Sequence, residues 1–155
     1  MTVQPIPTGY TSLTPFFVCS PGAKAVDFYT DVFNATVVGR NDLPDGRVAH
    51  CELQFPTGRM QLGDPAPAHN LIAPTGDDNV SRSTVLYCDD VDKVYAAAVE
   101  AGAKGYGEPS TFVTGDRYAA ILDPFGHRWA IMTRVEDVSE EEAKRRVDEW
   151  LASQS

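Results

Sequence analysis

The chain has 155 residues, of which 43% are hydrophobic and 23% charged, as in a globular domain with a core. Its formal net charge of −9 argues against a nucleic-acid-binding protein, and no apolar run approaches the roughly 20 residues of a membrane-spanning helix. The N-terminus has no signal-peptide pattern, and the three cysteines form no CxxC pair. We therefore expect a reduced, cytoplasmic protein.

The first half of the sequence predicts a strand followed by an amphipathic helix. Residues 10–19 are rich in β-forming side chains. Ser20 as the N-cap and Pro21 as the first helical residue mark the start of the helix, and Asn34 marks its end. Between these points apolar residues recur at helical spacing, namely Val26, Phe28, Tyr29, Val32 and Phe33.

Two further strands follow this helix. Residues 43–46 form a turn, and residues 47–55 alternate between two faces. One face is apolar and the other polar, with Ala49, Cys51, Leu53 and Phe55 opposed to His50, Glu52 and Gln54. A turn at residues 56–58 leads into a last strand over residues 59–63. Strict alternation predicts that the strand buries only its apolar face.

The second half predicts the same order of elements after a linker without periodicity. Residues 83–88 form a strand, and a helix capped by Asp89 or Asp90 ends at Gly102.

A loop and a hairpin complete the second half. The loop spans residues 105–115 and includes a short strand at residues 111–113. A strand at residues 117–122 is joined through the Asp-Pro-Phe-Gly turn at 123–126 to a last strand at residues 129–133.

The tail predicts a separate helix. Residues 139–142, Ser-Glu-Glu-Glu, form a capping box, and Val138 and Ala143 are placed for a hydrophobic staple. The helix carries an apolar stripe made of Ala143, Val147, Trp150 and Leu151. A stripe with a tryptophan has to bury against something, either the body of its own chain or a partner subunit.

The two halves are related as a repeat. Tyr29 corresponds to Tyr95 at an offset of 66, and the turn at residues 56–58 corresponds to residues 124–126 at an offset of 68. We expect an α+β fold of two tandem βαβββ modules that form a curved mixed sheet with a shared cleft. The predicted boundaries are a single domain at residues 1–135, divided into module one at about 10–64, a linker at 65–81 and module two at 82–135, with a helical extension at 136–155.

Three segments carry a family resemblance: VDFYTDVF in the first helix, LYCDDVDKVYAAAVEAGA around the second, and DPFGHRWAIMT at the end. Together they resemble the vicinal oxygen chelate superfamily, most closely its PhnB-like group of glyoxalases, bleomycin resistance proteins and dioxygenases. The resemblance covers residues 10–135 and implies the glyoxalase/bleomycin resistance fold. The predicted C-terminal helix lies outside it.

Catalytic members of that superfamily hold a metal with His, Gln or Glu at four cleft-facing sheet positions. Matching the motifs places three positions on Thr14, Ser83 and Ala130. The fourth lies near Gln61, although the repeat offset favours Leu62. Thr, Ser and Ala do not supply the donors that a divalent metal needs. The resemblance therefore implies ligand binding without a metal or another cofactor.

Strand alternation assigns a mixed set of side chains to the cleft. The predicted ligand-binding residues are Phe16, Val18, His50, Glu52, Gln54, Tyr87, Tyr118, Arg128 and Met132. His50 and Glu52 point the same way and are the candidate catalytic residues, as an acid/base pair or as metal ligands. The alternative is a hydrogen-bonded polar pair on an open sheet face.

Three functions follow from these features. The first is a binding protein that sequesters a small aromatic or antibiotic-like molecule in the cleft without a metal. The second is a superfamily enzyme of the lyase, isomerase or dioxygenase type that uses His50 and Glu52 as acid/base or as ligands of a divalent metal. The third is a structural or regulatory dimer with a vestigial cleft. The expected partners are a small molecule and a second copy of the chain in a homodimer, and neither nucleic acid nor membrane.

Overall fold

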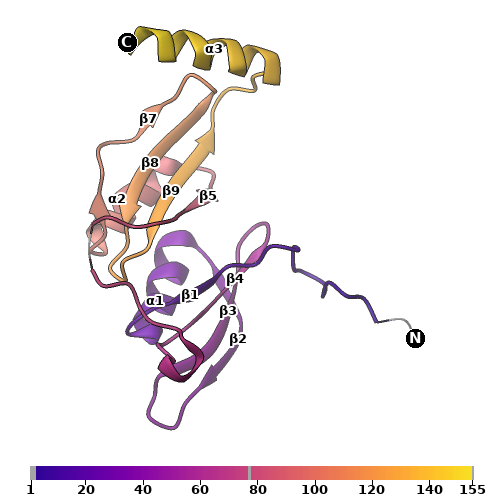
Figure 1. The fold of residues 1–155 in the computed structure, drawn as a ribbon, viewed down its shortest axis with the longest axis vertical. Coiled ribbons are helices and arrows are strands. Elements are labelled where there is room, and N and C mark those ends of the chain that lie inside the picture. Colours follow the sequence, from indigo (N-terminus) through magenta and orange to yellow (C-terminus); the bar gives the residue numbers. More distant parts are fainter. Residues whose placement is uncertain (1–2, 77, 155) are drawn as a thin grey trace. The chain divides into compact units, whose positions relative to one another are not determined.

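The computed structural model describes residues 3–76 and 78–154, which divide into two compact units on either side of residue 77 (Figure 1). Unit 1 follows the order βαβββ, and unit 2 follows the same order with one strand replaced by two short ones. A third helix ends the chain. Two tandem modules and a C-terminal helix were predicted, and this is confirmed. None of the helices in the described ranges is long and apolar enough to cross a bilayer.

Unit 1 is a four-stranded sheet with one helix on it. Its elements are β1 (Phe16–Val18), α1 (Gly22–Phe33), β2 (Thr36–Asp42), β3 (Val48–Gln54), β4 (Arg59–Gly63) and the 3-10 helix η1 (Pro67–His69). The strand order is β1-β4-β3-β2, in which β1 and β4 are parallel and the other pairs antiparallel. The core lies between α1 and the sheet and contains Phe17, Cys19, Tyr29, Phe33, Cys51, Leu53 and Leu62. Asn34 ends α1 as predicted, in the left-handed conformation with φ 55°.

The start of α1 differs from the prediction. Pro21, not Ser20, occupies the N-cap position, and no side chain of the N-cap bonds to the helix. The carboxylate of Asp64 takes that role, since it accepts hydrogen bonds from the backbone N–H of Gly22 at 3.0 Å and of Val48 at 2.7 Å. One side chain from the end of β4 thus joins the first turn of α1 to the first residue of β3.

The predicted alternation along β3 holds only beyond a β-bulge. Val48 is buried and Ala49 exposed, whereas strict alternation predicts the reverse. Two consecutive residues of β2 pair with His50 and with Val48, so the residue of β3 between these two is skipped. The extra residue in β3 inverts the order of faces, which is the usual effect of a bulge. From Cys51 onward the apolar residues face α1 and the polar ones the open side, as predicted.

Unit 2 has the same plan with a five-stranded sheet. Its elements are β5 (Ser83–Tyr87), α2 (Val91–Glu100), β6 (Lys104–Gly105), β7 (Ser110–Thr111), β8 (Asp116–Leu122) and β9 (Arg128–Arg134). The order is β5-β9-β8-β6, with β7 also on β8 and β5 parallel to β9. Asp90 caps α2 by accepting from the N–H of Lys93, as one of the two predicted caps. The short strand predicted at 111–113 is found at β7, and β6 was not predicted.

The hairpin between β8 and β9 is built around a buried carboxylate. Asp123 is 3% exposed and accepts from the backbone N–H of Phe125 at 2.9 Å and of His127 at 2.8 Å. Its other oxygen accepts from the indole N–H of Trp129 at 2.9 Å. The Asp-Pro-Phe-Gly turn is therefore fixed by its own first side chain, and His127 is a buried structural residue of that turn.

The C-terminal helix α3 (Glu140–Ser153) contacts the end of unit 2 near β7 and β8 (Figure 1). Ser139 caps it by accepting from the N–H of Glu142, as predicted. The Trp150 ring meets the Phe112 ring edge-on at 5.2 Å. No side chain of α3 is fully buried, so this contact covers only part of the predicted apolar stripe. The first of the two predicted alternatives, contact with its own chain, is thus present.

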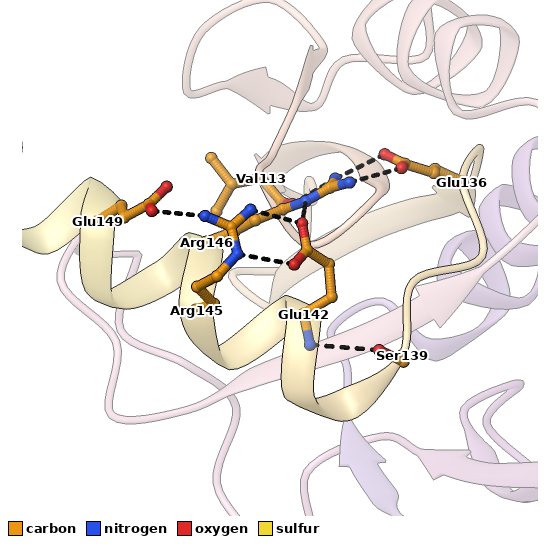
Figure 2. A network of polar contacts seen from close by, with 7 residues as sticks. All are labelled: Val113, Glu136, Ser139, Glu142, Arg145, Arg146 and Glu149. Carbon is orange, nitrogen blue, oxygen red and sulfur yellow. Dashed lines mark hydrogen bonds and ion pairs between the residues drawn. The ribbon is translucent and has the colours of Figure 1, made fainter.

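Arginine side chains complete the attachment of α3. Arg146 donates to the Glu136 carboxylate at 2.8 Å and to the carbonyl oxygen of Val113 at 3.3 Å (Figure 2). Arg145 and Arg146 both donate to Glu142, and these hydrogen bonds lower the pKa of Glu142 to about 2. The carboxylate therefore holds the arginine that joins α3 to the body of unit 2.

The pH dependence of this attachment follows from the pKa of Glu142. An unpaired glutamate titrates near 4.5, so the contribution of Glu142 is fully present above that pH and is lost as the pH falls toward about 2. We expect the amide-exchange protection of residues 140–153 to decrease across this window. In Glu142→Gln the protection should be low at neutral pH and lack this step. Equal protection in both proteins would contradict the role of Glu142.

Candidate functional site

The two units correspond at an offset of 68 residues for β3 and β8, and of 69 residues for the first strand, the helix and the last strand. The ends of β1 and β5, and the starts of α1 and α2, are each separated by 69 residues. By the offset of the last strands Ala130 corresponds to Gln61. Leu62, which the sequence offset of 68 favours, is fully buried on the side of α1. Ala98, also fully buried, corresponds to Tyr29, so the predicted pairing of Tyr29 with Tyr95 is wrong.

The four positions at which the family resemblance places a metal do not fit one. The Thr14 hydroxyl donates to the carbonyl oxygen of Thr11 at 3.2 Å, and the Ser83 hydroxyl accepts from Arg128 at 2.7 Å. Ala130 supplies a methyl group, and an amide such as that of Gln61 is a weak ligand by itself. Within residues 3–76 and 78–154, no three His, Cys, Asp or Glu side chains are grouped to hold a metal ion.

The open face of unit 1, opposite α1, is organised by an arginine that the sequence analysis did not single out. Arg59 lies 3.6 Å from the Glu52 carboxylate, and its Nε donates to the Gln54 side chain at 2.8 Å. Its guanidinium also lies over the ring of Tyr10, 4.7 Å from the centroid. Two predicted ligand-binding residues, Glu52 and Gln54, are thus held by a neighbouring cation.

The two candidate catalytic residues lie on this face with different partners. His50 lies beside the ring of Phe16 at 6.1 Å between centroids, whereas Glu52 faces Arg59. Across the described part of the chain no hydrogen bond joins His50 to Glu52. Both are half-buried, while Val18, another predicted ligand residue, is 6% exposed and offers little surface.

The open face of unit 2, opposite α2, is aromatic. Tyr87 is 54% exposed, Tyr106 39% and Tyr118 38%. Met132 pairs with Tyr87 on one side and with Tyr118 on the other, so the three predicted ligand residues are neighbours. Tyr106 was missed because its segment was predicted as a loop. Its backbone N–H donates to the carbonyl of Ala120 at 2.9 Å, which brings it beside β8.

Arg128, the remaining predicted ligand residue, lies at the start of β9 on the same face. Its Nη1 donates to the Ser83 hydroxyl at 2.7 Å, and its guanidinium lies 5.9 Å from the centroid of the Tyr106 ring. Lys104 lies 5.6 Å from the same centroid and forms an ion pair with Asp78.

The cysteines do not provide a reactive nucleophile. Burial raises the pKa of the Cys51 thiol and of the Cys88 thiol, which keeps both protonated at neutral pH. Cys19 is fully buried beside the Tyr29 hydroxyl. These thiols act as small core side chains, as the sequence analysis predicts.

A sequence model of the Glyoxalase/Bleomycin resistance protein/Dioxygenase superfamily matches residues 16–131. The chain belongs to this superfamily. The uncharacterized protein Rv0887c of Mycobacterium tuberculosis is 32% identical over 134 residues, which cover 84% of this chain and 79% of the relative. The uncharacterized protein Mb0911c of Mycobacterium bovis is also 32% identical over 134 residues, at 84% and 88%.

Solved structures of other proteins share the fold. TioX from Micromonospora sp. ML1 superposes with a TM-score of 0.63 at 18% identity, over 80% of this chain and 98% of that protein. A PhnB protein from Bacillus cereus, described as a putative 3-demethylubiquinone-9 3-methyltransferase, gives 0.61 at 15% identity, over 79% and 99%. These identities establish the fold alone. The match of the sequence model to residues 16–131 confirms the predicted membership of the superfamily.

Proposed function

We propose that this superfamily member binds a small aromatic molecule on the open sheet face of unit 2 without a metal ion and without converting it. The observation that carries the proposal is the residue set at the four family metal positions, Thr14, Gln61, Ser83 and Ala130. Two of these side chains are engaged in bonds within the chain, and one has no donor atom. A superfamily enzyme that activates its substrate through a metal needs a different set at these positions.

The open face of unit 2 supports an aromatic ligand. Ala120 pairs with Ala130, so two methyl groups form the floor between larger side chains; Ala130 is half-buried, and Ala120 is 7% exposed beneath its neighbours. Tyr87, Tyr106 and Tyr118 lie around this floor and remain more than one-third exposed. Aromatic surface left exposed in a group is typical of a binding site. A planar ring laid on the two alanines contacts the tyrosines at its edges.

The second candidate function, an enzyme that uses His50 and Glu52, has less support. A metal held by these residues has to displace Arg59 from the Glu52 carboxylate, which lies 3.6 Å away. A general base is best placed in contact with an orienting group, and here His50 contacts the apolar ring of Phe16.

A panel of aromatic natural products that includes bleomycin tests the proposal by isothermal titration calorimetry and NMR. We expect at least one member to bind, and Tyr87→Ala and Tyr118→Ala to weaken its binding about tenfold through the lost aromatic contact. Val99→Ala is the matched control, because Val99 is 42% exposed on α2, away from the open face. If no compound of the panel binds, or if all three variants bind equally, the proposal is wrong.

The same samples test the absence of metal. We expect chelator-treated protein to bind the ligand unchanged, and loading with Zn, Ni, Mn or Fe(II) to leave far less than one ion per chain by mass spectrometry. One tightly held ion that is lost in His50→Ala or Glu52→Gln would overturn the metal-free proposal. Conversion of the ligand that disappears in His50→Ala, with binding kept, would favour the enzyme.

A further inference from the structure

The arginines of this acidic chain are nearly all occupied by carboxylates. Those that lie within 4.0 Å of an aspartate or glutamate are Arg40, Arg47, Arg59, Arg117, Arg134, Arg145 and Arg146. Arg128 differs from them: among the residues that the structure describes, it has the Ser83 hydroxyl as its hydrogen-bond acceptor and no carboxylate within that distance. Arg128 is half-buried as a residue, and its hydrogen bond to Ser83 is exposed, so the guanidinium can be reached by an anionic ligand.

Arg128 also has a distinctive place in the sheet. It lies two residues before Ala130 on β9 and therefore on the same open face as the alanine floor. Arginine carries five N–H donors, and one of them is used on Ser83. The remaining donors lie beside the ring of Tyr106, at one end of the aromatic open face of unit 2.

The charged groups around Arg128 have partners of their own. The neighbouring cation, Lys104, is compensated by Asp78. At the other end of the face, Asp116 accepts from the Tyr87 hydroxyl and is 3.5 Å from Arg134. With a formal net charge of −9, the protein as a whole repels anions, so an anionic ligand needs a specific uncompensated partner.

We propose that Arg128 and Ser83 recognise the carboxylate of a planar aromatic acid whose ring lies on the alanine floor between Tyr106 and Tyr118. The guanidinium donates to the carboxylate oxygens in a charge-assisted pair, and the Ser83 hydroxyl orients the guanidinium. This inference rests on the proposed function and narrows the ligand from aromatic molecules to aromatic acids.

The test compares 2-naphthoate with 2-naphthamide, which have the same ring and nearly the same shape. By calorimetry at low ionic strength we expect the wild-type protein to bind the acid about tenfold more tightly, because a charged hydrogen bond replaces a neutral one. Arg128→Gln should remove this preference, because it weakens binding of the acid more than binding of the amide. Arg128→Lys should keep part of the preference, which shows that the loss does not come from unfolding.

Arg117→Gln is the matched control. It removes the same charge from unit 2, but Arg117 pairs with Asp92 of α2 on the other side of the sheet. The preference for naphthoate should survive this change. If acid and amide bind equally well to the wild type and both are weakened by Tyr87→Ala, the anion site is wrong and the aromatic site stands. If no compound of the aromatic panel binds, and neither 2-naphthoate nor 2-naphthamide binds, the proposed function itself is wrong.

Discussion

Asp123→Ala should lower the free energy of unfolding by about 3 kcal/mol or more, because it leaves buried donors without their acceptor. Asp123 is 3% exposed and accepts from the backbone N–H of Phe125 and His127 and from the Trp129 indole. Replacement by alanine also opens space at the tightest point of the β8–β9 hairpin. Chemical denaturation followed by circular dichroism measures the loss.

Two further variants separate the hydrogen bonds from the general effect of an altered turn. Asp123→Asn keeps an oxygen for the backbone donors but turns an amide N–H₂ toward the Trp129 indole, so an intermediate loss is expected. Asp45→Ala is the control, since Asp45 lies in the exposed turn between β2 and β3. A loss in Asp123→Ala no larger than that in Asp45→Ala would show that the buried network contributes nothing.

Asp64→Ala should lower the free energy of unfolding by about 2 kcal/mol, the second large effect. The variant loses a helix cap and leaves a further backbone donor unpaired. The carboxylate joins Gly22 at the start of α1 to Val48 at the start of β3. Asp31→Ala, on the exposed side of α1, is the matched control and should not destabilise the protein. Both variants are measured by the same denaturant titration.

The close approach of Gly22 to Asp64 permits a sharper test. A Cβ at residue 22 would lie 2.6 Å from the Asp64 carboxylate and 3.1 Å from the Cβ of Val48. Gly22→Ala should therefore destabilise the wild-type protein more than it destabilises Asp64→Ala, and the difference measures the coupling. Additive losses would mean that the Asp64 carboxylate does not lie against residue 22.

The sequence by itself determined the elements that depend on neighbouring residues. The ends of both module helices at Asn34 and Gly102, the cap at Ser139 and the Asp-Pro-Phe-Gly turn all follow from local backbone preferences. The faces of β9 were also predicted, because an uninterrupted strand has a strict period of two. The repeat and the motifs then identified the superfamily.

Other features were decided only by the pairing of distant segments. Asp64 caps α1 in place of Ser20 from 42 residues beyond Gly22, a distance over which no local pattern operates. The bulge at Ala49 inverts the faces of β3 because of how β2 pairs with it, and alternation within β3 contains no sign of this.

In the candidate site, too, some features follow from the sequence and others only from the tertiary structure. The sequence placed Tyr87, Tyr118, Arg128 and Met132 on one face through strand period, and their role as ligand residues remains a prediction. Tyr106 joins them only because a two-residue strand pairs with β8, too short for a periodic signal. The ion pairs of Arg59, Arg117 and Arg134 are likewise tertiary, since their carboxylate partners lie on other strands or on α2. The sequence thus specifies which side chains share a face of an uninterrupted strand. Only the tertiary structure shows that, among the described residues, no carboxylate lies within 4.0 Å of Arg128.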